Sequence, residues 1–300
     1  MDINKRLSVL WKRYENGLNY FKNSGLEKEW EEAENFYEGR HWPQATERTK
    51  NMPRPIVNLC SMIADNKKAS ILSSNPKMIF RTSEVYIDSV NIAEEGASKF
   101  SKFTEGLLKE LKQTDLDDLA QESATQLGTY IYHYYWDSNV SGGIQTPYVG
   151  AVRGEILYPK NVIFSNPAEK DEQKQKYIII VSTEDVETVK KLSKENGIKN
   201  YSDITADNEN IDEEFKDKEV CTVLTQYSRI NGHVVWEKAT KNAYIQEPTL
   251  WEPNKESIKL NYIEDLEEPK EPDNVLREVL FTNQLYPVVV SSHKRRKKSI

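Results

Sequence analysis

The acidic residues of this sequence are the first group whose spacing could support chemistry. Asp115, Asp117 and Asp118 lie close together in the sequence, and converging carboxylates hold the metal ions that assist phosphodiester hydrolysis. A metal-dependent nuclease is therefore one alternative. The same residues fall in the first turn of an expected helix, where negative charge interacts favourably with the helix dipole. We favour this second interpretation, and the acidic stretch 207–213 is interpreted as a solvated loop because it lacks the glycine of a calcium-binding loop.

The histidines are scattered, and the sequence assigns no catalytic partner to any of them. His133 lies between aromatic residues in an expected strand, which favours a core or interface role. His233 follows an expected turn and is expected to be exposed. P-loop, dinucleotide-binding, serine-elbow and zinc-helix motifs do not occur in the sequence. We therefore expect no enzymatic activity and no catalytic, cofactor-binding or metal-binding residues.

One dense basic run occurs in the chain. Its five consecutive cations could contact phosphate in a salt-dependent manner that does not depend on sequence, or they could form a solvated loop. The net charge of the chain is −7, which gives no general attraction to nucleic acid. The candidate nucleic-acid contacts are Lys294, Arg295, Arg296, Lys297 and Lys298.

The composition is that of a folded, polar-surfaced protein. The chain has 300 residues, of which 37% are hydrophobic and 30% charged, and its 6 Trp, 16 Tyr and 8 Phe supply the apolar area that disordered chains lack. Cys60 and Cys221 are isolated, so neither a disulfide framework nor a metal site is expected. With no signal peptide and no run of about 18 apolar residues, we expect synthesis in the cytoplasm and no membrane partner.

Helical periodicity dominates the first part of the chain. Gly39 and Gly128 stand where helices end in a left-handed residue. Asn58 is expected to cap one helix, and Thr114 is expected to cap another through a capping box with Asp117. The expected helices span residues 3–21, 26–37, 58–72, 88–111 and 114–127.

Strand patterns follow, after one short strand at 77–82. A turn is expected at 138–143, a hairpin around Asn231-Gly232, and a helix capped by Ser182 or Thr183 that ends near Gly197. The expected strands span 129–137, 144–152, 155–157, 162–164, 177–181, 219–229, 233–238 and 286–291.

This order of elements predicts an α+β fold, with N-terminal amphipathic helices followed by a strand-rich region. Two parts are expected. Residues 1–128 are mainly helical, and residues 129–300 form a strand-rich α+β part with an acidic loop at about 200–217.

Several segments carry a resemblance to a known family. They are the helix ending in Phe36-Tyr-Glu-Gly-Arg-His-Trp42, then Arg54-Pro-Ile-Val-Asn58 with Ser74-Asn-Pro76, then the helix 116–127 with the aromatic strand ending in Trp136-Asp137, then Tyr158-Pro-Lys-Asn-Val-Ile-Phe-Ser-Asn-Pro167, and Leu285-Tyr-Pro-Val-Val-Val290. In order and spacing the chain resembles the portal proteins of tailed bacteriophages, in particular the podovirus-like group.

The resemblance implies a structural and non-enzymatic role. Portal proteins form rings, commonly dodecameric, at one capsid vertex of the virion. The ring conducts double-stranded DNA during packaging and ejection, and it contacts capsid and scaffold proteins, the large terminase subunit and the neck or tail adaptors. The chain would supply the wing-like N-terminal portion, because the stem, clip and crown of the family come later. The alternative is another head or neck adaptor without a channel.

Overall fold

The structure is a computed structural model in which the chain forms two compact units. Unit 1 combines Met1–Glu29 with Leu157–Val290 and Arg295–Ile300, and unit 2 combines Trp30–Ile156 with Ser291–Lys294. The sequence predicted a division at residue 128 by element type, whereas the units divide the chain at residues 29 and 156 by contact. The described residues are 3–73, 77–81, 90–142, 148–207, 219–230, 233–251 and 285–292.

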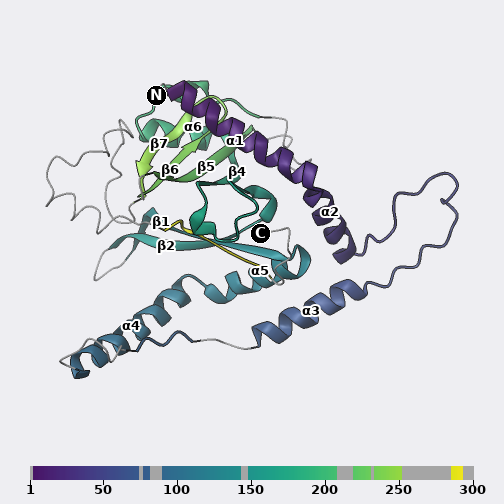
Figure 1. The fold of residues 1–300 in the computed structure, drawn as a ribbon, viewed down its shortest axis with the longest axis horizontal. Helices are drawn as coiled ribbons and strands as arrows, with labels where there is room; N and C mark the ends of the chain where they lie inside the picture. Colours follow the sequence, from purple (N-terminus) through teal and green to yellow (C-terminus); the bar gives the residue numbers. More distant parts are fainter. Residues whose placement is uncertain are drawn as a thin grey trace. The chain divides into compact units, whose positions relative to one another are not determined.

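Helices come first and strands later, which confirms the predicted α+β class (Figure 1). In chain order the elements are α1 (Ile3–Ser24), α2 (Leu26–Tyr37), α3 (Leu59–Leu72), α4 (Val90–Glu110), α5 (Gln113–Gln126), β1 (Thr129–Gly142), β2 (Tyr148–Leu157), η1 (Pro159–Asn161), β3 (Val162–Phe164), η2 (Glu172–Lys174), β4 (Tyr177–Asp185), α6 (Val186–Glu195), η3 (Tyr201–Asp203), β5 (Val220–Ile230), β6 (His233–Ala239), β7 (Tyr244–Leu250) and β8 (Val288–Ser292).

Unit 1 is built on a five-stranded antiparallel sheet with the order β3-β4-β5-β6-β7. Strands β5 and β6 pair with Ile230 opposite His233. This register leaves two residues between the strands, as expected for the Asn-Gly hairpin. The hairpin prediction is therefore confirmed, although Asn231 and Gly232 lie outside the described residues.

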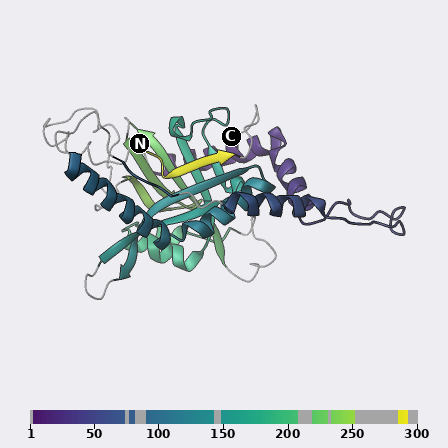
Figure 2. The same cartoon turned by 90° about the horizontal axis from the view of Figure 1, so that it is seen from below.

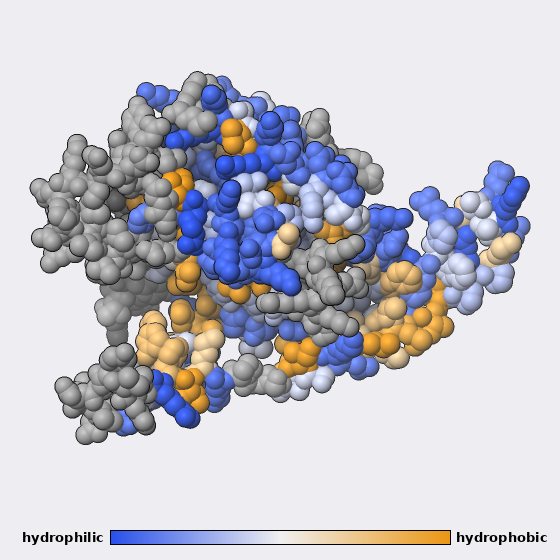
Figure 3. All heavy atoms as spheres, viewed as in Figure 1, coloured by the Kyte–Doolittle hydropathy of each residue, from blue (hydrophilic) through white to orange (hydrophobic). Residues whose placement is uncertain are grey.

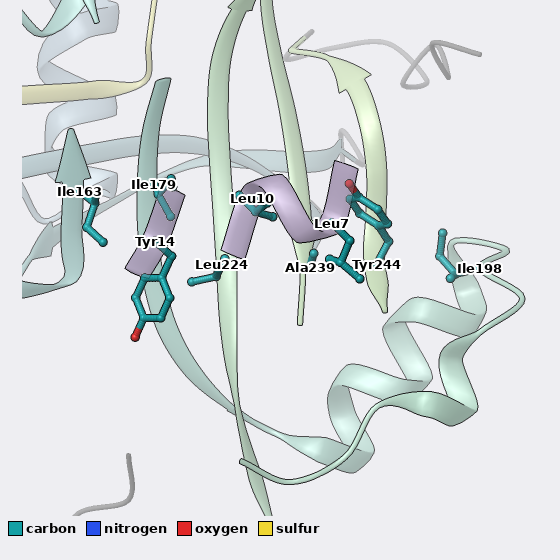
Figure 4. Packing of buried hydrophobic residues seen from close by; sticks show 9 residues of the cluster. All are labelled: Leu7, Leu10, Tyr14, Ile163, Ile179, Ile198, Leu224, Ala239 and Tyr244. Atoms are coloured by element: carbon teal, nitrogen blue, oxygen red, sulfur yellow. The ribbon is translucent and has the colours of Figure 1, made fainter. Parts of the chain in front are cut away.

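Helix α1 covers one face of this sheet. Leu7, Leu10 and Tyr14 are buried, and their spacing places them on one side of the helix. They pack in one cluster with strand residues such as Ile179 and Leu224 (Figure 4). Burial of such a side chain contributes about 1.5–3 kcal/mol, so this seam fixes the N-terminal helix to residues more than 150 positions away.

Helix α6 packs against the opposite face. Successive strand residues point to opposite sides of a sheet, so Val223 lies in the cluster with Val186 and Val189 while Leu224 lies in the cluster with α1. The predicted cap of α6 at Ser182 or Thr183 is wrong. Strand β4 continues to Asp185, whose carboxylate accepts the Thr188 N–H at 3.0 Å.

In unit 2, α5 packs on β1, which pairs with β2. The buried residues of α5 are Leu116, Ala120 and Ala124. The turn predicted at 138–143 is wrong for residues 138–142, because β1 continues to Gly142. The strand predicted at 77–82 is also wrong for residues 77–81, which are irregular.

Helix ends in unit 2 follow the predicted glycines and one of the two predicted caps. Gly39 and Gly128 have φ values of +80° and +79°, a conformation that glycine adopts without a steric penalty. Asn58 caps α3 by accepting the Ser61 N–H at 3.1 Å. The Thr114 cap is wrong, since α5 begins at Gln113 after Lys112, which has a φ of 52° and makes no side-chain cap.

Candidate functional site

Unit 2 carries an extended set of apolar side chains that are exposed to solvent. Their exposed fractions range from 39% to 70%, and Figure 3 shows apolar residues gathered over α3. Large exposed apolar side chains that gather on one part of a soluble protein can mark an interaction site. We call the set the apolar arm surface. It consists of Trp42, Met52, Ile56, Val57, Leu59, Met62, Ile63, Ile71, Met78, Ile79, Phe80, Phe100 and Phe103.

Helix α3 is central to this surface because several of its large apolar side chains are exposed. Leu59 and Ile63 are each 53% exposed, and no residue of α3 is fully buried. Its half-buried residues are Ser61, Ala64, Lys68 and Leu72, of which only Leu72 is a large apolar residue. The helix therefore exposes most of its large apolar residues together with polar residues such as Asn66.

The contacts that hold α3 in this orientation are polar. Asn58 donates from Nδ2 to the Tyr37 carbonyl at 2.6 Å. Lys68 forms ion pairs with Asp118 at 2.9 Å and with Glu122 at 3.2 Å on α5. These anchors lie at the start and in the second half of α3. They orient the helix through polar side chains, so its exposed apolar residues are not needed to hold it in place.

Segment 77–81 and α4 extend the apolar arm surface with aromatic rings. The Phe80 N–H donates to the Ser101 Oγ at 3.0 Å, and the Phe80 ring meets Phe100 edge-on at 4.6 Å. Phe100 in turn stacks on Phe103 with centroids 6.3 Å apart. Phe100 and Phe103 remain 53% and 64% exposed, so the row of rings has one free side.

The loop between α2 and α3 is held together by its own hydrogen bonds. Arg54 donates to the Pro43 carbonyl at 2.7 Å and to the Thr49 Oγ1 at 2.9 Å. The Trp42 Nε1 donates to the Pro55 carbonyl at 3.1 Å. Because these bonds close the base of the loop, Trp42 and the neighbouring apolar residues are presented from a defined backbone. Figures 1 and 2 show the loop extending beyond the ends of both helices.

The acidic residues considered for metal binding serve other contacts. Asp117 accepts from the Tyr132 hydroxyl and from Gln113 Nε2, both at 2.7 Å, and Asp118 pairs with Lys68. Burial and the neighbouring Asp117 raise the pKa of Tyr132, so this hydroxyl stays a proton donor. Among the described residues, no group of three or more histidine, cysteine or acidic side chains is arranged to hold a metal ion.

The histidines also occupy separate positions. His133 is buried, and its Nδ1 lies 2.7 Å from Glu155 Oε1, with the ring stacked on Tyr135. This agrees with the core role expected for His133. The expected exposure of His233 is wrong, since its side chain is half-buried and its Nδ1 is enclosed. His41 Nε2 lies 3.0 Å from the Phe36 carbonyl.

Lys294, Arg295, Arg296, Lys297 and Lys298 lie outside the described residues, as does His293. Their role as phosphate contacts therefore stays a prediction.

Sequence reasoning did not find the apolar arm surface. Leu59, Met62 and Ile63 have the spacing of an ordinary core stripe, and a stripe alone does not tell which side of a helix is packed. The one available signal was the opposite stripe, where Ser61, Ala64 and Lys68 are suited to close packing and to an ion pair.

Comparisons with known proteins do not identify the chain. No protein-family model matches the sequence, and no curated protein matches it either. Of the helices in the described ranges, none has both the length and the apolar character needed to span a bilayer.

Proposed function

We propose that this protein is a self-assembling structural protein of the portal type. In this proposal it forms a ring at one vertex of a tailed-phage capsid, conducts double-stranded DNA, and contacts the terminase and the neck or tail proteins. The observation that carries the proposal is the outward apolar side of α3. The segment order from Phe36 to Val290 supports the same assignment by resemblance.

The energetic argument begins with the state of α3 in a single copy. Leu59, Met62 and Ile63 are each more than half exposed. Covering the exposed half of such a side chain contributes roughly 1 kcal/mol. Assembly with a partner that covers α3, segment 77–81 and α4 would therefore gain several such contributions, which a monomer forgoes.

A ring satisfies this surface without a second kind of protein. Homo-oligomers with closed symmetry are the commonest soluble assemblies, and a standard interface covers about 800 Å² on each partner. A neck or tail adaptor without a channel would use the same surface on a different protein. Portal and adaptor differ in whether the purified protein assembles with itself.

The test is electron microscopy of the purified protein, with mass photometry over a range of concentrations. Annular particles with a central hole support the proposal. A persistent monomer at high concentration contradicts it. This measurement decides the function independently of which residues form the interface.

A variant of α3 tests the surface itself. Leu59→Gln, Met62→Gln and Ile63→Gln together replace exposed apolar side chains with a good helix former, so the fold is retained while the particles dissociate. The control is Val149→Gln with Leu285→Gln, because these residues are 74% and 60% exposed but lie outside the apolar arm surface. Intact rings in the α3 variant would exclude α3 from the interface.

A further inference from the structure

Two exposed segments next to each other in the sequence carry opposite charge. The loop 40–55 contains Arg40, Arg48, Lys50 and Arg54 against a single acidic residue, Glu47. Helix α2, in contrast, contains five glutamates and one lysine. Charge complementarity of this kind governs which surfaces meet and in which orientation.

Three of the glutamates of α2 and Glu38, directly after the helix, form a stripe. Glu27, Glu31, Glu34 and Glu38 follow one another at helical spacing, at the positions i, i+4, i+7 and i+11, which lie on one side of a helix. Glu27, Glu31 and Glu38 are exposed. We call these four residues the acidic stripe.

The basic loop presents its two distal cations to solvent. Arg48 and Lys50 are exposed, and within the described part of the chain neither forms an ion pair with an acidic side chain. Arg40 instead pairs with Glu38 beside it, and Arg54 donates to the loop backbone and to Thr49. Arg48 and Lys50 are thus the cations available to a second molecule.

Apolar residues accompany the charges on the loop. Trp42 and Met52 are 48% and 60% exposed, and the loop extends past the end of α2 in both ribbon views (Figures 1 and 2). A loop that extends away from its own helix can reach the helix of a neighbouring copy. Each copy then offers one basic, apolar projection and one acidic receiving surface.

Docking of the loop on the acidic stripe is compatible with two kinds of symmetry. In an isologous dimer the loop of each copy meets the acidic stripe of the other, because residue i contacts residue j and j contacts i across the two-fold axis. A head-to-tail contact repeats the same pairing from copy to copy and closes into a ring when the rotation between copies allows it. The ring of the proposed function requires the head-to-tail contact, so the proposed function, and not the charge alone, selects this arrangement.

We propose that the basic loop of one copy docks against the acidic stripe of the next copy. Arg48 and Lys50 face Glu27 and Glu31 across this contact, while Trp42 and Met52 supply its apolar part. This inference rests on the proposed ring and specifies its direction. It names a second copy of this chain as the occupant of the acidic stripe.

The experiment is a charge reversal with rescue, read by mass photometry and electron microscopy. Arg48→Glu with Lys50→Glu is expected to raise the protein concentration needed for half-assembly at least tenfold, and Glu27→Arg with Glu31→Arg is expected to do the same. Combining all four changes restores opposite charges across the contact. The combined variant is therefore expected to assemble within about threefold of the wild type.

A matched control makes the same change of net charge in unit 1. Lys191→Glu with Lys199→Glu replaces two exposed lysines, and this variant is expected to assemble like the wild type. If the wild type forms rings and the reversed loop also does, the docking inference is wrong and the ring stands. If the combined variant fails to recover, the pairing of these two surfaces is wrong. If the wild type forms no rings, the proposed function itself fails.

Discussion

Gly17 is the residue of α1 at which the packing of the helix on the sheet can be tested most directly. A Cβ added at this position would overlap Ile163 Cγ2 and would lie 2.8 Å from Cδ1 and 2.9 Å from Cγ1. All three contacts are closer than real carbon contacts. Because Ile163 is 2% exposed and belongs to the core cluster, it has little room to move away.

The expected magnitude follows from two opposing effects. Alanine is favoured over glycine inside a helix by about 1 kcal/mol. Overpacking a core costs about 1–3 kcal/mol. Gly17→Ala is therefore expected to destabilise the protein by about 1 kcal/mol. Gly106→Ala in α4, where nothing lies within 4 Å of the added carbon, is expected to stabilise by about 1 kcal/mol.

The assay is urea unfolding of both variants, followed by circular dichroism, together with a double mutant. In an Ile163→Ala background the obstruction is removed, so Gly17→Ala is expected to become stabilising there, with a coupling energy of about 1–3 kcal/mol. The reasoning is refuted if Gly17→Ala stabilises the wild type as much as Gly106→Ala does. Equal effects of Gly17→Ala in the two backgrounds would refute it as well.

Three further predictions concern hydrogen bonds and a buried acid. Asn58→Ala removes the cap of α3 and is expected to lower the stability of this helix by about 1–2 kcal/mol. Amide hydrogen exchange in α3 should then be roughly 5- to 30-fold faster. Asn66→Ala, on the exposed side of the same helix, is the control and should leave exchange unchanged or slower. Tyr132→Phe removes the hydroxyl donor to Asp117 and is expected to lower the free energy of unfolding, measured in urea, by about 1 kcal/mol. An unchanged free energy of unfolding would mean that water replaces this contact. Burial raises the pKa of Glu237. Above the ordinary carboxyl pKa of about 4.3, the unfolded state therefore releases a proton that the folded state still holds. The stability contributed by this group falls as pH rises beyond that value. Glu237→Gln should therefore match the wild type in thermal unfolding at low pH and exceed it increasingly towards neutral pH, and a pH-independent difference would contradict this.

Local signals in the sequence predicted the elements better than their contacts. Gly39, Gly128 and the Asn58 cap were identified correctly because glycine backbone freedom and an asparagine cap act within a few residues. The register of the β5–β6 hairpin was predictable for the same reason. The cap at Thr114 failed because α5 begins one residue earlier, after Lys112, which is in a left-handed conformation that its residue type does not favour.

Other errors come from contacts that are distant in sequence. Residues 138–142 of the turn expected at 138–143 are strand instead, because β1 continues to Gly142 despite the turn-forming residues there. Likewise, the apolar stripe of α3 was predictable but its exposure was not. Whether Leu59 and Ile63 are core or surface depends on Lys68 reaching Asp118, an ion pair across 50 residues. The chemistry of Asp117 was open for the same reason, since its partner Tyr132 lies on another element.

The central claim is that the apolar arm surface mediates self-assembly into a ring. The most direct measurement is electron microscopy of the purified wild-type protein beside the Leu59→Gln, Met62→Gln and Ile63→Gln variant at the same concentration. The account predicts annular particles with a central hole for the wild type and dispersed single copies for the variant. A wild type that stays monomeric at high concentration, or a variant that forms the same rings, would contradict it.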